Sequence, residues 1–290
     1  MNTSRYTPED LIGRTVDLVS LPDIYVRLKA VVDDPESSMG DVADVVAGDP
    51  ALTARLLKIA NSPFFGFPAR VATVTRAISL LGTQQIHDLV LATTVADAFS
   101  SMSTEMIRMQ DFWSHSIRCG LLSRRLAQEC NVLDSERLFV EGLLHDLGHL
   151  IMYRSLPEAS AAALRQSQQQ ARPLFLVERE LIGCDSAQIG STLMRNWHFP
   201  PGLIESVRYQ NEPAKAEEFR LEVAIMHIAV QLKERDVAGP KASDRPPCID
   251  PAAWQITGLT EAVLEPVCAA AGAQVATTVD MLFPNKRLSA

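Results

Sequence analysis

The segment EGLLHDLGH, residues Glu141–His149, is the stretch on which the fold prediction depends. It places an adjacent histidine and aspartate, His145 and Asp146, inside an apolar run of helical pattern. A second histidine, His115, lies upstream on another segment of helical pattern. Imidazole and carboxylate groups are common metal ligands, and a metal that they hold can activate water for phosphoester hydrolysis. The segment therefore raises the question of whether a complete metal site surrounds it.

The sequence on either side repeats one pattern, in which apolar residues recur three or four positions apart and Gly, Pro or Asn/Asp/Ser residues close each stretch. Asp49 and Pro50 are typical of a capped helix start. A helix over Val74–Leu81 should end at Gly82, and a further helix, capped by Thr83, should run from Gln84 to about Phe99. The chain is therefore predicted to be all-α.

The composition limits the classes of partner. The 290 residues include 27 Lys and Arg against 35 Asp and Glu, which gives a formal net charge of −8 and makes a nucleic-acid partner unexpected. The five cysteines are scattered, as in reduced cytosolic proteins. The N-terminal residues lack the pattern of a secretory signal, and the apolar runs are shorter than a bilayer is thick, so we expect a cytoplasmic protein without a membrane partner.

Motifs across the chain follow the order found in HDOD domains, a branch of the HD superfamily of metal-dependent phosphohydrolases, and the chain resembles that family. The matching motifs are Leu21-Pro22, Asp49–Leu52, Ala60–Ser62, Ala77–Gly82, Phe112–Ser116, Gly142–Gly148, Trp197 and Pro200. The resemblance implies an N-terminal helical subdomain packed on an HD-like helical subdomain.

The predicted boundaries are an N-terminal extension (residues 1–20), an HDOD domain (21–232) divided into a helical bundle (21–100) and an HD-like bundle (101–232), a flexible loop (233–251) and closing helices (252–290). The loop assignment depends on a segment rich in proline, charge and small residues between Glu234 and Pro251.

In catalytic relatives, the resemblance implies a divalent metal held by an upstream histidine, the His-Asp doublet and a distal aspartate. Carried onto this chain, the first three positions are His115, His145 and Asp146. The best match to the distal aspartate is Val230, and a valine side chain cannot coordinate metal.

Three other positions also depart from the family pattern. Ser186 stands where a histidine is frequent, and Gln210 and Asn211 stand where a His-His pair is frequent. Hydroxyl and amide groups are weak ligands for borderline metals. No resident cofactor is therefore expected, and manganese, iron or zinc would bind only if a substitute ligand such as Asp185 or Glu141 completed the site.

Other interpretations of these residues are open. Two histidines with one carboxylate also form the ligand set of non-haem iron oxygenases, and the spacing of His145 and His149 is that of a zinc-peptidase helix. Against the peptidase, an aspartate follows His145, and Gly148 weakens the helix. A further interpretation gives these residues no metal. His115, His145 and Asp146 would then be remnants of a metal site that hydrogen-bond to each other and to buried backbone. His227 is the nearest additional histidine to examine.

Three functions follow from these observations. The favoured one is a non-catalytic bacterial signal-transduction or regulatory module that acts in trans on other signalling proteins, through protein or small-ligand binding, with a nucleotide as one type of ligand. The alternative is a metal-dependent phosphohydrolase acting on a nucleotide or cyclic dinucleotide. A DNA-binding role for the two helices that flank Gly82 is disfavoured, because residues 84–99 contain no lysine or arginine.

Overall fold

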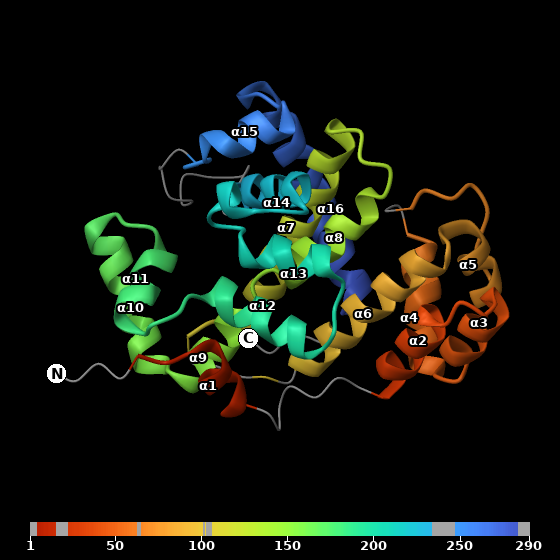
Figure 1. Cartoon of the computed structure of the whole chain (residues 1–290). Coiled ribbons are helices and arrows are strands. Elements are labelled where there is room, and N and C mark those ends of the chain that lie inside the picture. Colours follow the sequence, from red (N-terminus) through yellow and green to blue (C-terminus); the bar gives the residue numbers. More distant parts are fainter. Residues whose placement is uncertain are drawn as a thin grey trace. The chain divides into compact units, whose positions relative to one another are not determined.

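The computed structural model describes residues 5–15, 23–62, 65–100, 102, 106–233 and 247–283. Throughout these residues the regular elements are helices and no strand occurs, so the all-α prediction is confirmed (Figure 1). The described residues divide into two compact units. The first contains those within Met1–Asp17 and Met102–Ala273, and the second contains those within Leu18–Ser101 and Gln274–Leu288.

The second unit is a bundle of short helices. They are α2 (Asp23–Asp33), α3 (Met39–Ala47), α4 (Pro50–Ala60), α5 (Val74–Leu81), α6 (Thr83–Ser100) and the last turns of α16 (Leu264–Leu282). The predicted helix start is confirmed, because Asp49 accepts hydrogen bonds from the backbone N–H groups of Ala51 and Leu52 at 2.9 and 3.0 Å. Gly82 adopts φ +85° between α5 and α6, a conformation that glycine allows without strain.

A single asparagine ties the loop after α4 to the helix. The Asn61 side chain accepts a hydrogen bond from the Val71 N–H at 2.7 Å and donates to the carbonyls of Val71 and Leu57, both at 2.7 Å. The amide thus satisfies both polar backbone groups of Val71, as a neighbouring strand would. This contact holds Val71 of the loop against the end of α4.

The first unit contains the remaining helices. They are α1 (Pro8–Gly13), α7 (Met109–Glu129), α8 (Ser135–Leu144), α9 (Leu147–Ser155), α10 (Pro157–Gln170), α11 (Leu174–Leu181), α12 (Ser186–Asn196), α13 (Pro201–Arg208), η2 (Pro213–Lys215), α14 (Arg220–Leu232), α15 (Pro251–Thr257), η3 (Glu261–Val263) and the first turns of α16. Helix α7 packs against α8 and α14, and α9 packs against α12.

Residues before position 20 also contribute to the first unit. Helix α1 packs on α9 and α12, and the Tyr6 N–H donates to the Ile182 carbonyl at 2.8 Å. Thr7 caps α1 in a reciprocal capping box with Asp10. The segment expected to be an extension therefore includes a packed helix, which is too short to give a clear hydrophobic period in the sequence.

Glycines allow two helix pairs of the first unit to approach closely. A Cβ atom added at Gly142 of α8 would lie 2.6 Å from the Gly120 Cα of α7. A Cβ atom at Gly148 of α9 would lie 1.9 Å from the Ser186 carbonyl oxygen of α12. Gly148 is therefore explained by packing, because any larger residue would push α9 away from α12.

Some predicted segments lie outside the described residues. These are the Leu21-Pro22 motif, residues 1–4 and 16–20 of the predicted N-terminal extension, and residues 234–246 of the loop predicted over residues 233–251. The domain boundaries and the packing of one subdomain on the other stay predictions.

One described stretch satisfies the length and composition of a membrane span. Glu261–Leu282, which joins η3 and α16, has a mean hydropathy of 1.3. Core helices of soluble proteins reach such values too, but they are mostly buried, whereas 28% of the apolar window of this helix is buried. Length and composition alone are weak evidence for a span, and the cytoplasmic location stays a prediction.

The close approach of α9 to α12 is testable by substitution. Gly148→Ala should lower the free energy of unfolding by about 3 kcal/mol or more, at the upper end of typical over-packing costs, because the added methyl would meet backbone rather than a movable side chain. Urea unfolding followed by circular dichroism measures this change. Gly13→Ala is the matched control, since a Cβ atom there meets nothing within 4 Å. Equal stability of the two variants would contradict the packing role.

Candidate functional site

The His-Asp doublet lies where two helices of the first unit meet. Helix α8 ends at Leu144 and α9 begins at Leu147, so His145 and Asp146 form the connection between them. His145 is buried, whereas the Asp146 side chain is 19% exposed. Because the connection is not regular helix, the two side chains can reach a common neighbour, which adjacent positions on one helix would not readily do.

Both ring nitrogens of His145 have partners. Nδ1 lies 2.7 Å from the Gly142 carbonyl oxygen, and because a carbonyl only accepts, Nδ1 carries the proton. Nε2 lies 2.9 Å from Nζ of Lys233, so it accepts from the ammonium. Burial and then the charge of Lys233 lower the pKa of His145 to about 3. The imidazole is therefore neutral, and its one free lone pair is in use.

Asp146 faces a different histidine. Its Oδ1 lies 2.5 Å from Nδ1 of His149, and His149 Nε2 lies 2.8 Å from the Glu178 carboxylate. Burial lowers the pKa of His149, but the neighbouring charges, Asp146 first, outweigh burial and hold that pKa well above its usual range. Two carboxylate acceptors fix His149 as a double donor, an imidazolium ion.

Lys233 approaches the doublet from the end of α14. Its Nζ lies 3.6 Å from Asp146 Oδ2, in addition to the contact with His145. Burial raises the pKa of the Asp146 carboxyl, but the charges of His149 and then Lys233 hold it well below its usual range. Two cationic groups, Lys233 and His149, thus face two carboxylates, Asp146 and Glu178. The cluster has balanced charge without a metal ion.

Gln210 links the doublet to a second buried histidine. Its side-chain amide donates to the His145 carbonyl at 3.1 Å, and its own carbonyl accepts from His227 Nδ1 at 2.7 Å. His227 Nε2 in turn accepts from the Asp250 N–H at 2.9 Å. Burial lowers the pKa of His227. Gln210 and His227 therefore hold backbone segments together, and both ring nitrogens of His227 are in use.

The other positions at which the family carries metal ligands do not come together as a ligand set in this chain. His115 is exposed on α7, Asn211 and Val230 are half-buried, and Ser186 begins α12 with its N–H donated to Glu178 at 3.2 Å. Within the described ranges, no group of three His, Cys, Asp or Glu side chains is arranged to hold a metal ion.

The two substitute ligands considered from the sequence have structural partners. Asp185 caps α12 by accepting from the Gln188 N–H at 2.7 Å, and it also accepts from Arg179 Nε at 2.6 Å. Glu141 is fully buried in α8, where its carboxylate lies 3.8 Å from an Arg137 guanidinium nitrogen. Neither carboxylate belongs to a group of three potential ligands that could hold a metal ion among the described residues, so the family's fourth ligand has no evident replacement there.

Sequence reasoning missed two members of the cluster, Lys233 and Glu178, and it missed the pairing of His149 with the two carboxylates. Lys233 carried a usable signal, because it follows Val230 by three residues and therefore projects from a similar face of α14. Glu178 carried none, since its contact with His149 spans 29 residues of sequence.

Known proteins resemble this chain in sequence and in fold. A protein of unknown character from Treponema pallidum (strain Nichols) is 24% identical over 215 residues, which cover 72% of this chain and 41% of the relative. The chain thus spans less than half the length of that curated relative. A crystal structure of a proposed phosphohydrolase from Shewanella amazonensis SB2B superposes with a TM-score of 0.66 at 26% identity, covering 94% of this chain and 95% of the other.

A crystal structure of a proposed signal transduction protein from Marinobacter aquaeolei VT8 superposes with a TM-score of 0.70 at 24% identity, covering 93% of this chain and 61% of the other. The HDOD domain model matches residues 18–213, more than half of the 290 residues. The chain belongs to the HDOD domain family.

Proposed function

We propose that this chain is a non-catalytic signal-transduction module that regulates other signalling proteins in trans by binding them. Membership of the HDOD family supports a signalling role, as does the fold shared with the Marinobacter protein. The non-catalytic part of the proposal is carried by one observation, the contact of the Lys233 ammonium with His145 and Asp146.

The contact matters because it uses the lone pair that a metal would need. His145 can offer a metal only Nε2, since Nδ1 donates to the Gly142 carbonyl, and Nε2 already accepts from Lys233. Lys233 also comes from α14, the helix on which the family's distal aspartate is expected. A cation that belongs to the chain thus takes the place of a bound one, and a divalent ion beside it would meet electrostatic repulsion.

The phosphohydrolase alternative draws support from the likeness to the Shewanella protein. It would require the Lys233 side chain to leave His145, and a metal would then have His145 and Asp146 without the aspartate that Val230 replaces. Manganese, iron or zinc would in that state be held by too few ligands for stable binding.

Metal content separates the two functions. Protein incubated with manganese, iron or zinc and then desalted should retain far less than about one equivalent of any of them, because an ammonium holds the site. Elemental analysis, with a chelator-treated sample as control, measures this. Hydrolysis of bis(p-nitrophenyl) phosphate should not exceed that of buffer with the same metal.

The opposite result has a defined form. About one or two equivalents of retained metal, together with hydrolysis, both lost in His145→Ala, would establish the phosphohydrolase. The proposal of a non-catalytic module would then be wrong.

A stability comparison tests whether His145 has a structural role. His145→Ala should lower the free energy of unfolding by about 2 kcal/mol or more, because Lys233 and the Gly142 carbonyl lose a buried partner. His115→Ala, a change of the same type at an exposed position of α7, should alter it by less than about 0.5 kcal/mol. Chemical denaturation of both variants gives the values. Equal effects would show that the buried contacts of His145 contribute nothing.

The charge states of two histidines offer a third test. His145 should stay neutral at about pH 5 because its pKa is lowered to about 3, and His149 should stay an imidazolium ion through the pH range in which an ordinary histidine loses its proton, because its pKa is raised. Side-chain nitrogen shifts in NMR spectra, assigned with single His→Gln variants, report both states. Ordinary titration of both rings near neutral pH would contradict the arrangement around Lys233.

A further inference from the structure

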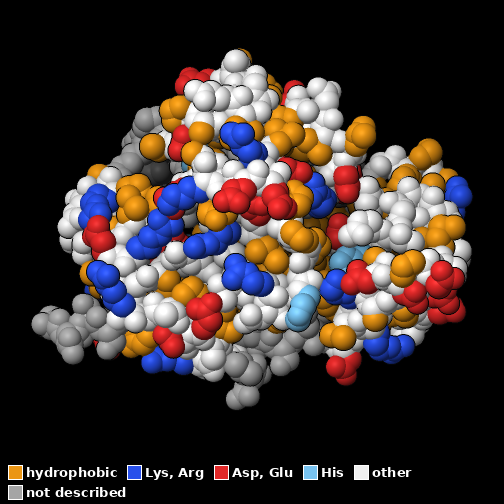
Figure 2. All heavy atoms as spheres, in the orientation of Figure 1, with side chains coloured by type: hydrophobic (Ala, Val, Ile, Leu, Met, Phe, Trp, Pro, Cys, Tyr) orange, Lys and Arg blue, Asp and Glu red, His pale blue; other side chains and the backbone are white. Residues whose placement is uncertain are grey.

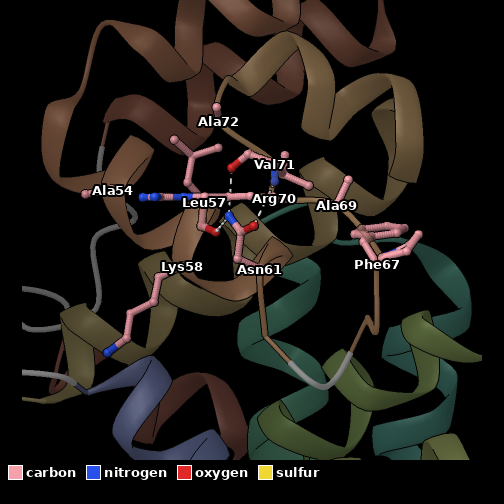
Figure 3. A pocket seen from close by; sticks show the side chains of 10 residues that line it. Ala54, Leu57, Lys58, Asn61, Phe67, Ala69, Arg70, Val71 and Ala72 are labelled. Atoms are coloured by element: carbon pink, nitrogen blue, oxygen red, sulfur yellow. Dashed lines mark hydrogen bonds between the residues drawn. The ribbon is translucent and has the colours of Figure 1, made fainter.

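The second unit contains an open groove of about 730 Å³ between α4 and the loop that follows it. Leu57 and Lys58 line it from the helix, and Phe67 and Arg70 line it from the loop. In Figure 3, Asn61 lies between Lys58 and Phe67 and pairs with the backbone of Val71. The groove therefore has apolar surface and two cationic side chains on a floor that hydrogen bonds hold in place.

The charge of the groove differs from that of the chain. No aspartate or glutamate lines it, although the chain has a net charge of −8. Two other cations of the same unit are paired, Lys29 with Asp33 and Arg55 with Asp97. Among the described residues, neither Lys58 nor Arg70 forms an ion pair; Lys58 Nζ donates to the neutral carbonyl of Asp280 at 2.8 Å.

Unpaired cations beside apolar surface fit a particular kind of partner. Carboxylates would gain electrostatic attraction from Lys58 and Arg70, and an apolar side chain could cover the half-buried Leu57 and Phe67. The volume is within the range of pockets that hold small ligands, which is enough for a few residues of an extended chain. The open shape suits a segment that enters and leaves the groove.

Nucleic acid fits less well. A phosphate backbone would extend beyond two cations and needs a broad basic surface. Figure 2 shows acidic side chains gathered over α2 and α3 of the same unit, where a polyanion would be repelled. Charge complementarity to an anionic partner is therefore limited to the groove.

We propose that this groove binds an acidic segment of a partner protein, with carboxylates at Lys58 and Arg70 and an apolar side chain at Leu57 and Phe67. The proposal names a docking surface for the regulation in trans proposed above. The groove and the His145 cluster belong to different units. Metal retained at the cluster would therefore not exclude peptide binding in the groove. Failure of the peptide to bind would likewise leave the metal measurement unchanged.

The test uses the full chain and a short fluorescein-labelled peptide in which glutamate and leucine alternate. Fluorescence anisotropy should show saturable binding that weakens with added salt. The same peptide with glutamine in place of glutamate should bind about tenfold more weakly or worse, because it loses the charge interaction.

Charge-reversal variants locate the binding. Lys58→Glu combined with Arg70→Glu should weaken binding of the glutamate peptide by about tenfold or more. Arg27→Glu combined with Arg76→Glu is the matched control, because it makes the same change of charge at exposed positions of the same unit outside the groove. All four substituted side chains are exposed, and melting curves confirm that each variant is folded.

Three results would overturn the proposal. One is equal affinity for the glutamate and glutamine peptides. Another is equal weakening by the groove variant and its control, which would mean that net charge alone attracts the peptide. The third is tighter binding of a labelled DNA duplex than of the peptide at physiological salt, with the duplex lost in the groove variant.

Discussion

Backbone contact between helices of the first unit is the constraint on which the rest of the site depends. Gly142 and Gly148 flank the His-Asp doublet, and a Cβ atom at either position would collide with backbone of α7 or α12. With these glycines, α8 and α9 sit deep enough to bury His145 and to place His149 against Glu178. Burial then decides the chemistry, because a buried group needs a partner for each polar atom and a compensating charge for each charge.

That need for compensation explains the composition of the cluster. A metal-binding site of the HD type gathers carboxylates and neutral imidazoles around a cation. Here the carboxylates are those of Asp146 and Glu178, and Lys233 with His149 balances them. The substitutions at Val230 and Gln210 agree with this change, since a valine offers no charge and the glutamine amide donates to the His145 carbonyl. The proposed loss of catalysis thus accompanies the gain of an internal cation.

The sequence predicted the features that depend on near neighbours. Asp49 as a cap and Gly82 as a helix end are each visible within a few residues, and both are found in the structure. The His-Asp doublet was expected inside a helical run, but it forms the connection between α8 and α9. The partners of those residues were not predictable in the same way. Glu178 lies 29 positions from His149, and helical periodicity gives no information on that contact. Lys233 lies 88 positions from His145, and its only local signal is its place three residues after Val230 on α14. The short helix α1 was missed for the opposite reason, because too few residues carry its pattern.

In the proposed module, Lys233 holds the position that a metal would take. A crystal structure of protein soaked in manganese, with anomalous diffraction data, distinguishes the ammonium from a metal ion. We expect side-chain density that joins Lys233 Nζ to His145 Nε2 and no anomalous peak near the doublet. An anomalous peak bound to His145 and Asp146, with the Lys233 side chain displaced, would contradict it.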